Sequence, residues 1–222
     1  MSFKEFREKD LGRITKTVLI SLITSFVVFG IVYFFKLRYI DGLLPKFGFY
    51  IFFAILSYAL IMPTLKKVRG YESLPCMSGM MIGMTVGMMA GFLPGFFVGA
   101  TNGMFWGSIW GMLVGMTFGI LSGKCCGIMG VMEGMMAGFM GGLMGAMTAL
   151  MMFNDNLRAS GVVIFIIGAI IMTGLNFLIY KETKSFERKT EIEELFTIVV
   201  SFILTTLTIW LSVFGPRSAL LA

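Results

Sequence analysis

Glycine occupies every fourth position from Gly79 to Gly127 without a miss. Each step of four residues advances about 400° around a helix, so such a stripe drifts by about 40° per step. Five or six glycines in one helix therefore expose backbone over more than half of its circumference. In a soluble helix glycine costs about 1 kcal/mol relative to alanine. In lipid, small residues four apart let helices pack closely, and this packing offsets the loss.

The spacing changes once, because Gly127 is followed by Gly130 at a distance of three residues. A step of three turns the stripe back by about 60°, and the four-residue spacing then resumes. We expect these glycines to be helix-packing positions. The predicted set is Gly79, Gly83, Gly87, Gly107, Gly111, Gly115, Gly130, Gly134, Gly138 and Gly142.

The composition indicates a membrane protein. The chain is 57% hydrophobic and 14% charged, with a mean hydropathy of +0.90, whereas soluble domains carry about 25% charged residues. A transmembrane helix needs about 20 mostly apolar residues. We therefore predict an all-α, polytopic integral membrane helical bundle with about seven transmembrane helices. The predicted spans are 17–35, 47–65, 74–99, 103–122, 126–152, 161–180 and 195–213.

The basic residues predict the orientation. With the N-terminus in the cytoplasm, 13 of the 18 Lys and Arg residues fall in cytoplasmic segments, as the positive-inside rule requires. The C-terminus is then outside, and the plasma membrane is the expected location. Residues 1–16 form a cytoplasmic segment, either an interfacial helix or a solvated tail, and residues 181–194 form a cytoplasmic loop. Segment 17–65 holds the first two spans, segment 161–213 holds the last two, and both enclose a central glycine-zipper unit, 74–152.

Several classes of function are disfavoured. The sequence has no histidine, which removes histidine-based triads and the commonest metal ligand. Its three cysteines, Cys76, Cys125 and Cys126, are too few for a disulfide framework. The net charge of +6 is spread over short loops, a pattern that sets membrane orientation and gives no argument for nucleic acid. We find no nucleophile–base motif and no phosphate-binding loop, so we do not expect an enzyme.

Sulfur is concentrated in the glycine-rich spans, where 18 of the 21 methionines lie between Met77 and Met152. At about 100° per residue, one narrow face of the fifth span carries a thiol, a carboxylate and six thioethers. Thioether and thiolate ligands select Cu(I) and related soft cations. The predicted cation site is Cys125, Cys126, Met129, Glu133, Met136 and Met140. The third span repeats the pattern with Cys76, Met77, Met80, Met81, Met84 and Met88 on one side.

The same residues have plainer interpretations, which the sequence leaves open. Methionine is a flexible filler beside irregular grooves, and cysteine a small buried hydrophobe. Glu133 is the only carboxylate between Glu72 and Asp155, and ionisable residues inside a bilayer are usually functional. It is either a proton relay, a cation ligand, a neutral hydrogen-bonded acid, or an interfacial partner of Lys124.

Two local resemblances concern the same spans. The stretches "MSGM" and "GMMIGM" with the glycine stripe resemble copper transporters of the Ctr type, which pair MxxxM and GxxxG motifs in a trimer of three-span subunits. That family's methionine-rich outer tail is missing, and the span count differs. The pair Cys125-Cys126 resembles mercury-uptake membrane proteins through "CC" alone.

Together these features predict a transporter, channel-like path or handling protein for a small soft cation such as Cu(I). The alternative is a glycine-zipper scaffold or assembly subunit with no transported substrate. The expected partners are the lipid bilayer and either further copies of the chain or another membrane protein.

Overall fold

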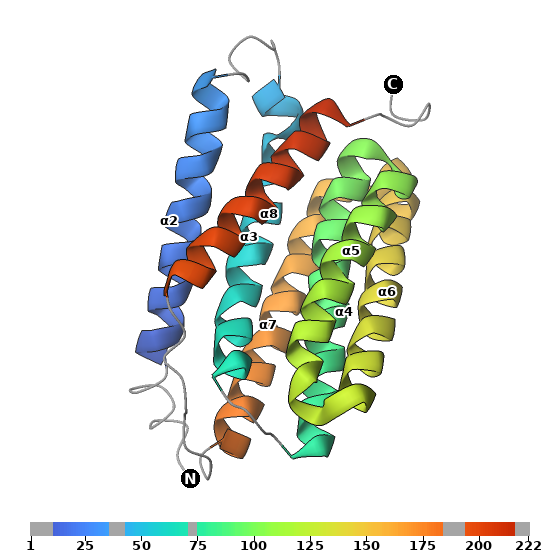
Figure 1. Ribbon diagram of the computed structural model, residues 1–222. Helices are drawn as coiled ribbons and strands as arrows, with labels where there is room; N and C mark the ends of the chain where they lie inside the picture. Colours follow the sequence, from blue (N-terminus) through green and yellow to red (C-terminus); the bar gives the residue numbers. More distant parts are fainter. Residues whose placement is uncertain (1–10, 36–42, 71–74, 184–193, 216–222) are drawn as a thin grey trace.

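The computed structural model describes residues 11–35, 43–70, 75–183 and 194–215 (Figure 1). The regular structure of these residues is helical. Its elements are α2 (Leu11–Phe35), α3 (Leu43–Arg69), α4 (Cys76–Asn102), α5 (Met104–Gly123), η2 (Lys124–Cys126), α6 (Gly127–Met151), η3 (Met152–Asn154), α7 (Leu157–Thr183) and α8 (Glu194–Phe214).

Seven helices in this part of the chain are long and apolar enough to cross a membrane. Each corresponds to one predicted span, so the prediction of seven spans in an all-helical bundle is confirmed. The chain is a multi-pass integral membrane protein, and its apolar helices contact the lipid bilayer. The predictions for residues 1–10 and for most of the loop 181–194 lie outside the described residues.

Three helices, α4, α5 and α6, pack backbone against backbone. A Cβ atom placed on Gly91 would lie 2.7 Å from the carbonyl oxygen of Gly138. One placed on Gly115 would lie 2.8 Å from the Cα of Gly91. Any side chain larger than hydrogen would therefore force these helices apart.

The contacts form five layers, each with one small residue from every helix of the unit. The layers are Gly83–Gly123–Gly130, Gly87–Gly119–Gly134, Gly91–Gly115–Gly138, Gly95–Gly111–Gly142 and Gly99–Gly107–Ala146. Layers four residues apart are separated by about 6 Å along a helix. The stack is therefore about 24 Å tall, most of the roughly 30 Å of a bilayer's hydrocarbon core.

The turn between α4 and α5 explains why the four-residue spacing continues across two helices. Gly103 makes the reversal with a φ of 100°, a conformation that favours glycine because it has no Cβ. Gly99 and Gly107 lie four residues on either side of Gly103 and face each other. A stripe of constant period centred on the turn therefore places a glycine of each helix at every level.

The one three-residue spacing between glycines, from Gly127 to Gly130, is explained by the turn between α5 and α6. The α5–α6 turn is wider, and it brings Gly123 against Gly130, seven residues later. A step of four to Gly127 and then three to Gly130 produces this pairing. Gly127 itself has a φ of 69° and nothing within 4 Å of its added Cβ, so it serves the turn rather than the packing.

The sequence predicts that four other spans enclose the three-helix unit. The structure instead places α2, α3, α7 and α8 on one side of it (Figure 1). Helix α4 carries most of that contact, while α6 packs mainly on α4 and α5. Tyr58, Ile82 and Val86 lie in the buried core between the two groups. The glycine-rich unit is thus an edge of the bundle, because its glycine layers use only the inward faces of α5 and α6.

The contacts around Gly138 predict a large effect from a single methyl group. Its added Cβ meets the backbone of Gly115 and Met116, and overpacking of this kind costs about 1–3 kcal/mol. Gly138→Ala should therefore lower the thermal unfolding midpoint of the purified protein in detergent. Gly174→Ala is the matched control, because nothing lies within 4 Å of its Cβ. Equal midpoints for the two variants would contradict the layered packing.

Candidate functional site

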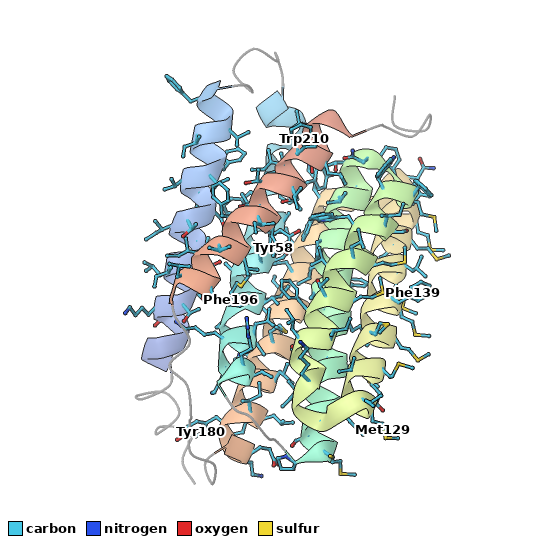
Figure 2. All side chains as sticks on the ribbon, viewed as in Figure 1. Tyr58, Met129, Phe139, Tyr180, Phe196 and Trp210 are labelled. Atoms are coloured by element: carbon cyan, nitrogen blue, oxygen red, sulfur yellow. The ribbon has the colours of Figure 1, made fainter. Side chains whose placement is uncertain are left out.

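The methionines of α6 project away from the bundle. Met129 and Met136 are 67% and 64% exposed, and Figure 2 shows Met129 at the lower end of α6 with Phe139 higher on the same helix. Helix α4 exposes four methionines in the same way. We call these residues the sulfur face: Met77, Met81, Met84 and Met88 of α4, and Met129, Met132, Met136, Met140, Met144, Met147 and Met151 of α6.

The interior of the three-helix unit offers no route for an ion. Its glycine layers bring the three backbones into contact at five levels. The sulfur atoms are therefore outside this unit, at the boundary with lipid. Any path for a soft cation along the predicted residues runs over the outer side of α4 and α6.

The two halves of the sulfur face are adjacent. A Cβ on Gly141 would touch the backbone of Met88, and one on Gly145 would touch that of Phe92. Both pairs differ by 53 in sequence number, and α4 and α6 run in the same direction (Figure 1). The glycine layers pair the same two helices at a difference of 47, so residues at one level of α4 and α6 differ by about 50, which puts Cys76 at the level of Cys126. Sequence reasoning missed Gly141 and Gly145, although Ala137, Gly141, Gly145 and Ala149 form a second stripe of small residues four apart.

Glu133 lies within the predicted thickness of the membrane. Gly119 and Gly134 share a layer, so Glu133 is level with Ile120, one turn from the end of α5. The 20 residues of α5 span about 30 Å, which matches the hydrocarbon core. The side chain is half-buried, and the structure records no ion pair with Lys124, which is exposed.

Two thiol-bearing residues meet at the lower end of these helices. The Cys126 thiol, just before α6, lies 3.5 Å from the carbonyl oxygen of Cys76 in the first turn of α4. Cys76 is exposed and Cys126 half-buried. The side chain of Cys125 lies outside the described residues. Among described residues no three Cys, Asp or Glu side chains gather, so a metal here needs thioether ligands or two thiolates.

Sequence reasoning also missed the small hydroxyl residues that α2 and α8 bury against each other and against neighbouring helices. The Ser21 and Ser201 hydroxyls are 2.9 Å apart and fully buried. The same helix faces bury Thr17 and Ser25 on α2, and Thr197, Thr205, Thr208 and Ser212 on α8. The signal was available, because residues 17, 21 and 25 and residues 197, 201 and 205 all follow a spacing of four. Small polar residues at this spacing hold transmembrane helices together.

Other polar contacts join α3 and α8 to the glycine-rich unit, and α7 to α3. Trp110 of α5 donates its indole N–H to the Tyr58 hydroxyl of α3 at 3.1 Å. Asn176 of α7 donates from its amide nitrogen to the Thr64 hydroxyl of α3 at 2.9 Å. Asn102 is the last residue of α4. It is buried there and donates to the Leu211 carbonyl of α8 at 2.6 Å.

Comparisons with protein-family models, with curated proteins and with solved structures find no match for this chain. A functional proposal therefore rests on the geometry and chemistry of the residues themselves.

The outward position of the sulfur face predicts its accessibility from lipid. A carbene-generating photoreactive lipid should label Met136 and Met140 in single chains reconstituted one per nanodisc, because both side chains are exposed on α6 of the monomer. Met62 and Met172 should remain unlabelled, since they are 2% and 1% exposed. Mass spectrometry of the labelled peptides gives the result. Labelling of the buried pair in preference to the α6 pair would contradict the arrangement.

Proposed function

We propose that this protein binds a soft metal cation such as Cu(I) and relays it along the sulfur face of α4 and α6. The observation that carries the proposal is that sulfur from two helices, some fifty residues apart in sequence, lies on one continuous outer surface. Thioethers are ligands that soft cations prefer. Neutral sites spaced along a helix bind weakly enough for an ion to leave as well as enter, which conduction requires.

The proposed ligands follow one another along α6 from the lower end of the sulfur face upward. The predicted site places Cys125, Cys126 and Met129 at the lower end, Glu133 one turn above Met129, and Met136 and Met140 beyond it. Glu133 supplies a negative charge at a depth where a cation would otherwise be costly. On the positive-inside rule the lower end is cytoplasmic, because α3 ends with Lys66, Lys67 and Arg69 there, and Lys124 lies in the α5–α6 turn.

We extend the proposal to a homo-oligomer in the plasma membrane. Ionisable groups in membranes usually face the bundle interior or a water-filled cavity, whereas Glu133 lies on the outer side of the three-helix unit. A second copy that covers the sulfur face would separate Glu133 and the bound cation from lipid. We propose no catalytic activity, since the sequence lacks histidine and any nucleophile–base motif.

The metal proposal predicts separate effects of two substitutions. Cys126→Ser and Glu133→Gln should each reduce Cu(I) uptake into proteoliposomes severalfold, because one removes a soft ligand and the other the charge that offsets the cation. Both variants should accumulate in the membrane as wild type does. Ser78→Ala, which changes a neighbouring hydroxyl on α4, is the control. If both site variants take up Cu(I) at the wild-type rate, the metal function is wrong.

The second candidate function is a membrane scaffold, which the solid glycine-rich core of the three-helix unit favours. Such a unit presents α6 as a rigid face for another subunit. On this proposal the protein assembles whether or not metal is present.

The scaffold proposal is tested by the mass of the protein in detergent rather than by its Cu(I) uptake. Light scattering in detergent should give a multiple of the 24.6 kDa monomer, and Met140→Trp should shift it toward the monomer by spoiling the fit of the α6 face. Phe202→Trp, at an exposed position of α8, should leave the mass unchanged. A monomeric wild-type protein would exclude both a scaffold built from copies of this chain and the homo-oligomer proposed above.

A further inference from the structure

The juxtaposition of Cys76 and Cys126 was not evident from the sequence, where fifty residues separate them. Cys126 ends η2, and Cys76 begins α4. The five glycine layers bring these two helix beginnings to the same end of the three-helix unit. The position of the two cysteines is therefore a consequence of the glycine packing.

The distance between them suits a shared ion. The Cys126 sulfur is 3.5 Å from the Cys76 carbonyl oxygen and 4.0 Å from that of Pro75. With ordinary bond lengths the two Cα atoms then lie within roughly 9 Å of each other. A metal–thiolate bond is about 2.3 Å long, so two cysteine side chains at that Cα separation are long enough for both sulfur atoms to bind one ion placed between them.

We infer that Cys76 and Cys126 form a two-thiolate capture site for Cu(I) at the entrance to the sulfur face, a proposal that rests on the proposed function. Binding replaces two S–H bonds by two metal–sulfur bonds and releases two protons to solvent. Two thiolates and one Cu(I) leave a net charge of −1 at the site. The exposure of Cys76 gives a cytoplasmic donor access to the site.

The site also leads to the next ligands on the path. Met129 follows Cys126 by three residues on α6, and its side chain is exposed. Glu133 follows one turn above Met129 on α6. The anionic thiolate pair therefore holds the ion more tightly than the neutral thioethers beyond it, which suits capture before relay.

The test measures Cu(I) affinity of the purified full chain by competition with a chromophoric Cu(I) chelator. Cys76→Ser should weaken binding by about 100-fold or more, because even partners of metal ligands are worth about 10–100-fold in affinity. Cys126→Ser should have a similar effect. The double variant should be no worse than either single variant, since one missing thiolate already destroys the pair. Ser78→Ala should bind as wild type does, and size-exclusion chromatography verifies that each variant remains folded.

A second measurement reports on the thiols without Cu(I). In a Cys125→Ser background, Cys76 and Cys126 are the only thiols of the chain. Phenylarsine oxide binds stably only when two thiols reach one arsenic atom. This variant should retain one equivalent of phenylarsine oxide against a monothiol wash, and further substitution Cys76→Ser should abolish retention.

The outcomes separate the two proposals. Wild-type affinity in Cys76→Ser with loss in Cys126→Ser would overturn the capture site and leave the relay standing on Cys125 and Cys126. Failure of the Cys125→Ser variant to retain phenylarsine oxide would also overturn the capture site. Absence of any Cu(I) binding by the wild-type protein would overturn both the relay and the capture site.

Discussion

The structure depends on direct contact between the backbones of α4, α5 and α6. In lipid, no hydrophobic force drives helices together, so association relies on close packing and polar contacts. At Gly91, Gly115 and Gly138 the packing is close enough that a methyl group has no room. One consequence is that the unit has a solid centre. Another is that its larger side chains point outward, which is why so many methionines of α4 and α6 face lipid.

The other four helices are held by a different kind of contact. Helix α8 crosses from α2 toward the upper end of α4 (Figure 1). It is anchored by the Ser21–Ser201 pair at one end and by the bond from Asn102 to the Leu211 carbonyl at the other. At the end of the bundle where α3 carries Lys66, Lys67 and Arg69, the guanidinium carbon of Arg69 lies 4.1 Å from the centre of the Phe196 ring of α8. Hydrogen bonds of small hydroxyls and of the Asn102 amide thus hold α8 against its neighbours, whereas close backbone contact at glycine holds α5 and α6.

The proposed chemistry follows from the first of these arrangements. Because the glycine layers fill the inside of the three-helix unit, a cation relay is confined to its outer surface, where thioethers of two helices form one face. The same packing sets the depth of Glu133 and brings Cys76 to Cys126. The glycine packing therefore determines both the closed interior of the three-helix unit and the outward position of the sulfur face, whether that face binds a cation or another subunit.

The sequence by itself determined the number of helices and their approximate bounds, and the glycine spacing predicted many of the positions where small residues recur on α4, α5 and α6. These follow from local properties: apolar length, turn-forming residues and the spacing of glycine. It did not determine that α4–α6 lie at an edge of the bundle, that the Cys126 thiol reaches the Cys76 carbonyl, or that Ser21 meets Ser201. Those relations join residues about 50 to 180 positions apart, and they depend on the register between helices. Only the tertiary structure decides that register, because the meeting of backbones at Gly123 and Gly130, or at Met88 and Gly141, fixes which residues share a level in the membrane.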